Sequence, residues 1–255
     1  MHHKVKGIVI KESSQGENSK LLTVLTELDG VITVKAKGAR SILASNLKSV
    51  QIFACSNMLL YCKNGYYTLV DAELIDDFYA VRESIESFAL ASYLCEVSGS
   101  VAIKDSENSV VLQLLLNSLY ALSRNFASVR FIKAVFEFRL ACLIGFEPDI
   151  NTCAKCETEL DLSAQNVLDV QNGIFLCSAC SGVTESSVTE YGTGISVSRT
   201  VIDALRYIIN AKSSRIFSFT VDDNSLCELG KITEIYLHLR LEKKYKTLDF
   251  LKSVL

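Results

Sequence analysis

The chain has 255 residues, of which 49% are hydrophobic and 22% are charged, and its net charge at pH 7 is −3. This composition is typical of a folded globular protein and excludes wholesale disorder. No run of 18 apolar residues occurs, which excludes a membrane-spanning helix, and the first residues lack the apolar core of a signal peptide, so we expect a cytoplasmic protein.

The acidity is concentrated in one segment of the chain. Residues 147–190 contain eight acidic residues and one basic residue, whereas Val31–Val70 contains no acidic residue at all. The basic residues of Val31–Val70 are Lys35, Lys37, Arg40, Lys48 and Lys63. A local excess of positive charge attracts a phosphate backbone whatever the total charge is. A solvated strand face with counter-charges elsewhere in the fold explains the same pattern, so charge alone leaves both interpretations open.

The N-terminal part of the chain predicts a small closed barrel. Five segments have the composition and two-residue period of strands: residues 4–12, 20–28, 31–37, 51–63 and 66–74. Two of the connections contain the residue pairs that favour type I′ hairpin turns, Asp29-Gly30 and Asn64-Gly65. Five short strands within about 75 residues are typical of a barrel.

The alternation in residues 31–37 places two lysines on the outer face of this barrel. Ile32, Val34 and Ala36 point to one side of the strand, and Lys35 and Lys37 point to the other. The candidate nucleic-acid-binding residues are these two and the cations that follow them: Lys35, Lys37, Arg40 and Lys48. Small barrels bind single strands through such a basic face together with stacking aromatic rings. The candidate rings, at least half of which we expect in the barrel core, are Phe53, Tyr61, Tyr66 and Tyr67.

From Asp76 onward the hydrophobic period changes to that of helices. The predicted helices are residues 84–98, 110–122, 127–144, 198–210 and 225–241. In the third of them, Phe131, Val135 and Phe138 form an apolar stripe, and Arg130, Lys133 and Glu137 are expected on the opposite, solvent-exposed side. We therefore expect a barrel domain at residues 1–79 and a helical domain at residues 80–255, interrupted by a separate lobe at residues 147–190.

Four of the nine cysteines form a predicted structural zinc site. Cys153-Ala-Lys-Cys156 and Cys177-Ser-Ala-Cys180 are separated by 20 residues, a spacing close to that of zinc ribbons. Two disulfides or a redox pair are the alternatives, and the cytoplasmic expectation and the duplicated motif disfavour them. Four thiolates leave no coordination position for water, so such a zinc is structural rather than catalytic. The other cysteines are expected to be small buried hydrophobic residues: Cys55, Cys62, Cys95, Cys142 and Cys227.

No catalytic constellation was found in the sequence. The chain lacks a nucleophile elbow, a P-loop and a dinucleotide-binding glycine motif, and it has only three histidines. The adjacent carboxylates Asp76-Asp77 and Asp222-Asp223 fit turn or cap roles better than acid–base chemistry, because neighbouring side chains diverge. We therefore expect no enzyme and no catalytic residue.

Several segments, taken in order, resemble the RecO family of bacterial DNA repair and recombination mediator proteins. The resemblance covers nearly the whole chain and rests on the order and spacing of the pieces. These are Gly7-Ile8-Val9-Ile10-Lys11, Glu17-Asn18-Ser19, Thr23–Leu28, Ala36-Lys37-Gly38-Ala39-Arg40, Gly145-Phe146-Glu147-Pro148 ahead of Cys153, and Leu248–Leu251 with Lys252-Ser253. Residues 41–45 depart from the family pattern, because the corresponding loop is often more basic.

The resemblance implies an α+β fold with an N-terminal five-stranded OB-fold barrel, a helical C-terminal domain and an inserted zinc ribbon with four cysteine ligands. It also implies binding of single- and double-stranded DNA, annealing of strands, and loading of RecA together with RecR onto strands coated by single-strand-binding protein. The acidic, hydrophobic tail of that protein is expected to contact the helical domain, where the helix bearing Arg130 and Lys133 is a candidate. Nucleoid association in the cytoplasm follows from these partners.

A different class of function is compatible with the same residues. The weakly basic segment Ser41–Ser45 also fits a zinc-stabilised interaction scaffold with little affinity of its own for DNA. A zinc hydrolase is disfavoured, because four thiolates close the metal shell. Titration of the chain with labelled single strands separates the first two classes.

Overall fold

The structure is a computed structural model that describes residues 1–15, 19–37, 44–161, 164–181 and 194–255. The chain forms two compact units, one of Met1–Asn125 with Tyr245–Leu255 and the other of Phe126–Lys244. The domain boundary that the sequence predicts between residues 79 and 80 stays a proposal. Within the described part of the chain, no helix is both long enough and apolar enough to cross a membrane.

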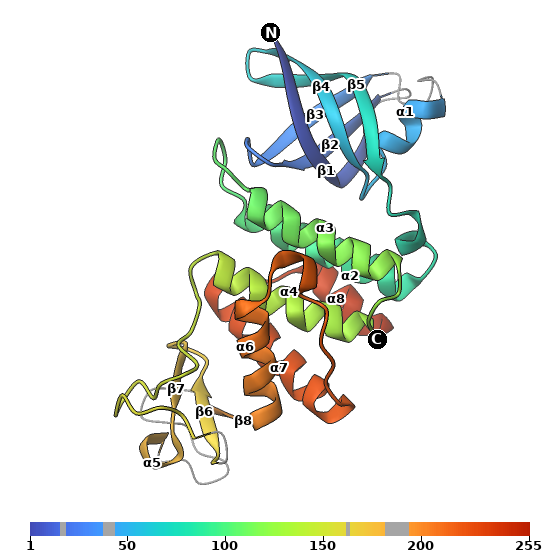
Figure 1. Ribbon diagram of the computed structural model, residues 1–255. Helices are drawn as coiled ribbons and strands as arrows, with labels where there is room; N and C mark the ends of the chain where they lie inside the picture. Colours follow the sequence, from blue (N-terminus) through green and yellow to red (C-terminus); the bar gives the residue numbers. More distant parts are fainter. Residues whose placement is uncertain (16–18, 38–43, 162–163, 182–193) are drawn as a thin grey trace. The chain divides into compact units, whose positions relative to one another are not determined.

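Five strands of the first unit close into a barrel, as the sequence predicts (Figure 1). They are β1 (His2–Gln15), β2 (Ser19–Thr26), β3 (Val31–Lys37), β4 (Cys55–Lys63) and β5 (Tyr66–Asp76). Their order around the barrel is β1-β2-β3-β5-β4, and β1 pairs with β4 to complete the ring. A short helix, α1 (Ala44–Ser49), lies between β3 and β4 in the chain. A closed five-stranded barrel of this kind is the OB fold.

Strand β1 closes the barrel because it pairs with a different strand along each half. Residues 2–8 pair with β4, and residues 7–15 pair with β2. A bulge between Val9 and Lys11 accompanies this change of partner, since a bulged strand bends. Gly7 lies where the two pairings overlap, and a Cβ there would come within 2.7 Å of Val24 Cγ1. The absence of a side chain at Gly7 therefore allows β2 to approach closely.

The two predicted hairpins form, but their turns differ. Asn64 and Gly65 have φ angles of 51° and 77°, as a two-residue type I′ turn requires. The first hairpin has a longer connection, because β2 ends at Thr26 and the loop spans residues 27–30. The prediction of a two-residue turn at Asp29-Gly30 is therefore wrong. The backbone N–H and the hydroxyl of Thr26 both donate to the Gly30 carbonyl oxygen at 2.8 Å, which closes the loop one residue before β3.

The rest of the first unit consists of helices. They are the 3-10 turn η1 (Tyr79–Arg82), α2 (Ile85–Val101), α3 (Ser109–Ser123) and α8 (Lys246–Val254). The sequence predicts α2 and α3 but not α8, which is too short to be stable alone. Tertiary contacts hold α8 against α2. The Tyr245 hydroxyl lies 2.7 Å from the Ser100 hydroxyl, and the Thr247 hydroxyl donates to the Glu96 carboxylate at 2.5 Å.

The second unit contains three long helices and a small lobe. The helices are α4 (Val129–Leu143), α6 (Arg199–Asn210) and α7 (Asp223–Leu241), with the 3-10 turn η2 (Ser213–Arg215) between the last two. All three lie where the helical period predicts them. The lobe has a three-stranded sheet in the order β7-β6-β8 and one short helix. These elements are β6 (Asn166–Asp169), β7 (Ile174–Leu176), α5 (Ser178–Ser181) and β8 (Gly194–Val197).

Two charged residues of α4 lie in the core of the second unit rather than on its surface, so the prediction of a solvent-exposed side is wrong for them. Lys133 is 8% exposed and Glu137 is fully buried. The Lys133 ammonium lies 2.8 Å from carboxylate oxygens of both Glu137 and Glu234, and the Thr233 hydroxyl donates to Glu137 at 3.1 Å. Burial disfavours the ammonium, but the two carboxylates outweigh it and raise the pKa of Lys133. This ion pair network joins α4 to α7, so Lys133 is not an exposed contact for a partner.

Removing the buried cation should destabilise the second unit strongly. Lys133→Met leaves the Glu137 carboxylate buried without its cation, which costs about 3–5 kcal/mol. The double variant Lys133→Met with Glu137→Leu removes both charges and should recover most of this loss. Urea unfolding of the two variants measures the difference. A Lys133→Met protein as stable as the parent would mean that the network carries no stability.

Candidate metal centre and nucleic-acid interface

The four cysteines lie on two short turns that the lobe of the second unit brings together. The group comprises Cys153, Cys156, Cys177 and Cys180. The first pair lies in the turn after Thr152, and the second pair lies at the end of β7 and in α5. The backbone N–H of Ala154 donates to the Phe175 carbonyl oxygen at 2.9 Å, which fastens the first turn to β7. The two pairs, whose nearest members are 21 positions apart in the chain, thus form one cluster.

The sulfur atoms of this cluster lie close enough together to bind one metal ion. All four lie within 4.8 Å of one another, and the Sγ atoms of Cys156 and Cys177 are 3.8 Å apart. With Zn–S bonds of about 2.3 Å, the edge of a tetrahedron of sulfur atoms is about 3.8 Å. The donor set therefore fits a four-coordinate soft metal ion. The group can hold a metal ion with no position left for a substrate.

Neighbouring hydrogen bonds favour the thiolate form at two of the four cysteines, Cys156 and Cys153, whereas the contact with Cys156 and the other sulfur atoms raises the pKa of Cys180 to about 12. The Thr158 hydroxyl lies 3.0 Å from Cys156 Sγ and lowers the pKa of that thiol to about 6. Burial opposes ionisation of Cys153, but donation from backbone N–H groups, led by that of Cys177 at 3.4 Å, lowers its pKa. Thr158 lies outside the Cys-x-x-Cys motif, so the sequence alone does not identify it as a residue of the metal site.

The lobe is fastened to α7 through one arginine. The Arg240 guanidinium stacks over the Tyr236 ring at 4.6 Å and donates to the Gln171 carbonyl oxygen in the β6–β7 turn. Gly173 in the same turn has φ 71°, and a Cβ there would come within 2.4 Å of the guanidinium. The Tyr236 hydroxyl donates to the Phe146 carbonyl oxygen at 2.9 Å. These contacts thus hold the β6–β7 turn of the lobe against α7.

The remaining cysteines divide into two groups. Cys55, Cys95 and Cys142 are buried, as predicted. Burial raises the pKa of Cys55 to about 11 and that of Cys142 to about 12, which keeps these thiols protonated and unreactive. Cys62 is half-buried and Cys227 is exposed, so the prediction of burial is wrong for these two. Neither belongs to the sulfur cluster.

Strand β3 presents its lysines on the outside of the barrel, as its alternation predicts. Ile32, Val34 and Ala36 are buried in the barrel core, whereas Lys37 is exposed and Lys35 is half-buried. Lys35 lies beside Leu21 of β2 and Thr68 of β5, and Lys37 lies beside Ser19 of β2. None of these three paired residues carries a carboxylate.

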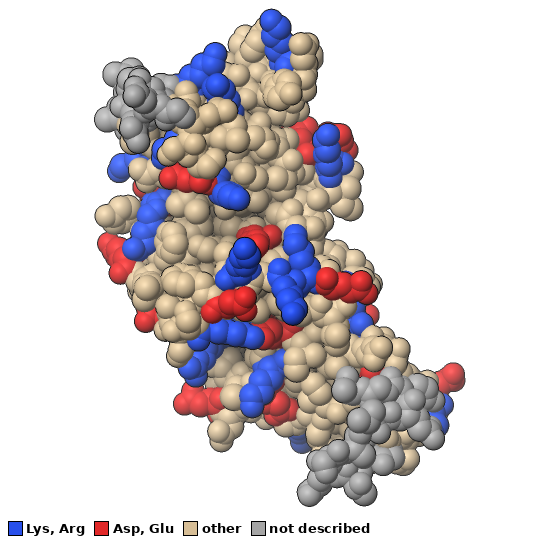
Figure 2. Space-filling model, turned by 180° about the vertical axis from the view of Figure 1, so that it is seen from behind, with Lys and Arg blue, Asp and Glu red and all other residues tan. Residues whose placement is uncertain are grey.

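Of the other two predicted cations, Lys48 and Arg40, the structure describes only Lys48. Lys48 is exposed near the end of α1. Arg40 lies outside the described residues. In the described part of the chain, Lys35, Lys37 and Lys48 form no ion pair. Figure 2 shows basic and acidic side chains interspersed over one face of the molecule.

The candidate stacking rings separate into core and surface residues. Phe53 is fully buried, with its ring 5.4 Å from that of Phe88, so it is not available for stacking. Tyr67 is half-buried and packs against the barrel core. Tyr66 is 79% exposed and Tyr61 is 42% exposed. Of the four candidates, Tyr66 is therefore the ring best placed to stack with a base.

Lys63 adds a cation next to that ring. Lys63 and Tyr66 are directly paired across the β4–β5 hairpin, and both are exposed. In OB folds the β2–β3 face and the loop between β4 and β5 bind oligonucleotides. Lys63 belongs to the acid-free segment Val31–Val70, but only the hairpin pairing identifies it as a member of this surface. We refer to Lys35, Lys37, Lys63 and Tyr66 as the barrel face.

Comparison with family models covers most of the chain. Residues 1–78 match the model described as "Recombination protein O N terminal", and residues 82–249 match "Recombination protein O C terminal".

Curated proteins similar to this chain have one name. The protein named DNA repair protein RecO from Acetivibrio thermocellus is 34% identical over 252 residues, which cover 98% of this chain and 96% of the relative. The proteins of that name from Dehalococcoides mccartyi and Clostridium perfringens are 27% and 25% identical. These alignments cover 98% and 97% of this chain, and 95% and 96% of the two relatives. The similarity thus extends over the barrel, the helices and the cysteine lobe.

Loss of one cysteine should release the metal and loosen the lobe. Cys153 is the buried member of the cluster, and Cys153→Ser removes a thiolate from the centre of the site. We expect loss of bound metal and a decrease in melting temperature of at least about 5 °C. Elemental analysis and thermal unfolding measure the two effects. Cys227→Ser, which changes an exposed cysteine outside the cluster, is the matched control. Parent protein that is purified without metal and has full stability would contradict the assignment.

Proposed function

The chain belongs to the RecO family of DNA repair proteins, and we propose that it acts as a non-catalytic, DNA-binding recombination mediator. In this proposal it binds single- and double-stranded DNA and anneals complementary strands. Together with RecR it loads RecA onto strands that single-strand-binding protein coats. The family and the barrel topology support the proposal, and so does the absence of a catalytic motif from the sequence.

The observation that carries the proposal is the barrel face. Lys35 and Lys37 project from β3, and Lys63 and Tyr66 stand across the β4–β5 hairpin. These are the two parts of an OB fold that contact oligonucleotides. Cations hold the phosphate backbone without reading sequence, and an exposed ring stacks on any base. Arg40 and Lys48 are proposed to extend the same contact. Binding should therefore be tolerant of sequence and sensitive to salt.

The proposed mechanism of annealing is electrostatic. Two complementary strands repel each other through their phosphates, and cations that neutralise part of this charge lower the repulsion. Sequence-tolerant contacts leave the base edges available for pairing. Binding also raises the local concentration of strands, which favours the bimolecular pairing step. The chain itself contributes positioning and charge and performs no covalent step.

The cysteine cluster is proposed to hold a structural Zn²⁺ ion. Four thiolates close the shell, so the ion would stabilise the lobe and would not activate water. The lobe has a strongly acidic sequence, with eight acidic residues and one basic residue in residues 147–190. Such charge repels a phosphate backbone. We propose that the lobe serves stability or protein contacts and that it does not bind DNA.

A second candidate function is an interaction scaffold with weak affinity for DNA. The observation that favours it is the uncharged run Ser41-Ile42-Leu43-Ala44-Ser45, which adds no cation to the sequence that follows β3. In this alternative, RecR and the tail of single-strand-binding protein supply the localisation. Direct binding of oligonucleotides by the isolated chain distinguishes the two functions.

Reversing the charge of β3 should weaken DNA binding and its dependence on salt. For Lys35→Glu with Lys37→Glu we expect an affinity for single-stranded oligonucleotide about tenfold lower. Loss of two phosphate contacts should also reduce the salt slope by about 1.4. Fluorescence anisotropy at several salt concentrations measures both. Lys212→Glu with Lys231→Glu changes the net charge equally on exposed sites of the second unit. Equal affinities of the two double variants would exclude the β3 assignment and favour the scaffold.

The exposed ring of the β4–β5 hairpin should contribute stacking energy. Tyr66→Ala is expected to cost about 1–3 kcal/mol of oligonucleotide binding, the typical worth of one base–aromatic contact. Because stacking is not ionic, the salt slope should stay unchanged. Tyr79→Ala is the control, since Tyr79 is also exposed but lies in η1, outside the barrel face. If both variants bind as the parent does, Tyr66 is not a stacking platform.

A further inference from the structure

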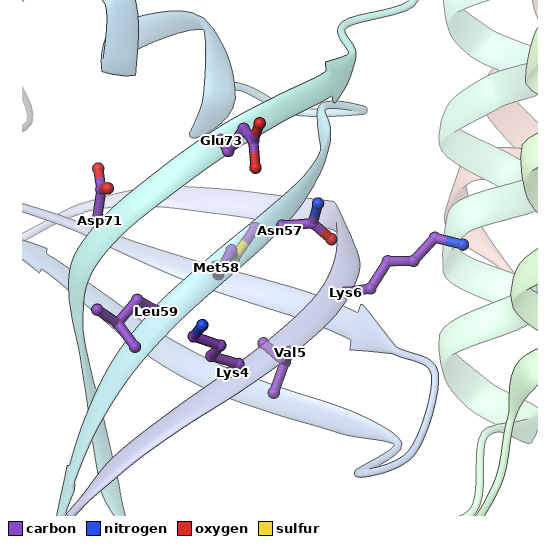
Figure 3. A pocket seen from close by; sticks show the side chains of 8 residues that line it. All are labelled: Lys4, Val5, Lys6, Asn57, Met58, Leu59, Asp71 and Glu73. Carbon is purple, nitrogen blue, oxygen red and sulfur yellow. The ribbon is translucent and has the colours of Figure 1, made fainter.

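A groove on the outside of the barrel lies on strands other than those of the β3 lysines. It has a volume of about 490 Å³ and is formed by β1, β4 and β5 (Figure 3). The lining residues are Lys4, Val5, Lys6, Asn57, Met58, Leu59, Asp71 and Glu73. We call it the outer groove. Its size is within the range of pockets that bind small molecules or short peptide segments.

The strand register arranges opposite charges on the two rims of the outer groove. Each lysine of β1 faces a residue of β4, which in turn faces a carboxylate of β5. The two rows are Lys4–Leu59–Asp71 and Lys6–Asn57–Glu73. The lysines therefore form a basic rim and the carboxylates an acidic rim, with an amide and an apolar side chain between them. The Lys6 side chain points away from the carboxylates, toward the neighbouring helices (Figure 3). The register of β4 and β5 shifts between Leu59 and Leu60, beside the groove, and such irregularities bend a strand.

The two rims do not neutralise each other directly. One strand separates them, and two strand spacings place the backbones of β1 and β5 roughly 10 Å apart. Within the described residues, Lys4, Lys6 and Glu73 take part in no ion pair. Asp71 Oδ1 accepts a hydrogen bond from the Ala72 backbone N–H at 2.9 Å. Charges of both signs thus remain at the two edges of the groove.

This charge arrangement selects the chemistry of the ligand. A polyanion gains energy at the basic rim and loses it at the acidic rim, so the outer groove does not favour a nucleic acid backbone. A ligand with both signs of charge gains at both rims. The members of each rim are two residues apart on one strand, which places them about 6.6 Å apart. Alternate side chains of an extended peptide have the same spacing.

We propose that the outer groove binds an extended segment of a partner protein in which acidic and basic side chains alternate. In this complex the acidic side chains lie along Lys4 and Lys6, and the basic side chains lie along Asp71 and Glu73. The Asn57 amide hydrogen bonds with the peptide backbone, and Leu59 contacts its apolar atoms. The inference does not depend on DNA binding, because the groove and the barrel face share no residue.

A pair of synthetic peptides tests this inference on the full chain. The first peptide repeats Glu-Lys, so that in the extended form one side carries the acidic side chains and the other side the basic ones. The second peptide repeats Glu-Glu-Lys-Lys, which has the same composition but places both charges on each side. In ¹⁵N NMR spectra, the Asn57 side-chain amide should shift with the first peptide, and the second peptide should bind about tenfold more weakly. Equal shifts with both peptides, or no shift with either, would overturn the proposal.

Variants that reverse the charge of one rim or of both rims provide a second test of the proposal. Lys4→Glu with Lys6→Glu, and separately Asp71→Lys with Glu73→Lys, should each weaken binding of the alternating peptide about tenfold. The fourfold variant that exchanges both rims should restore binding, because the same peptide fits in the reverse direction. Failure of this rescue in a folded variant, as judged by thermal unfolding, would contradict the proposal. A single-stranded oligonucleotide that shifts Asn57 where the peptide does not would identify a nucleic acid site instead.

Discussion

Closure of the barrel by β1 is the constraint on which the proposed surfaces of the first unit depend. This strand pairs with β4 along its first half and with β2 along its second, and the bulge after Val9 accompanies the change. Gly7 permits the overlap, since no Cβ fits against Val24. Once the ring is closed, side chains must alternate between a filled interior and the outside. The position of every outward cation on the barrel follows from that alternation.

The closed ring gives the barrel two outer surfaces of different charge. On β3, Lys35 is paired with the neutral residues Leu21 and Thr68 on the two adjacent strands and Lys37 with Ser19 of β2, which suits a polyanion. On β1, β4 and β5 the lysines oppose carboxylates across one strand, which suits a ligand of mixed charge. A net charge of −3 describes neither surface. The division of the charge among strands is the quantity that bears on function. Residues 147–190, with eight acidic residues and one basic residue, mask a positive net charge in the rest of the chain.

Sequence patterns predicted the features that depend on short-range spacing. The alternation of β3, the Asn64-Gly65 turn and the two Cys-x-x-Cys pairs all appear as expected. Features that need a partner distant in the chain were missed. Lys133 looks solvent-exposed until α7 brings Glu234 to it, and α8 forms only because residues near Tyr245 pack on α2. The outer groove could not be predicted either, because only the strand register places residues 4 and 71 on the same row.

The central claim is that single-stranded DNA binds the outside of β3 and the β4–β5 hairpin. Photo-crosslinking tests it most directly, with an oligonucleotide that carries reactive bases and with mass spectrometry to locate the adducts on the full chain. The account predicts crosslinks at Tyr66 and at neighbouring residues of β3 and β5, which decrease as salt is raised. Crosslinks confined to the lobe of residues 147–190, or to the helices of the second unit, would contradict it.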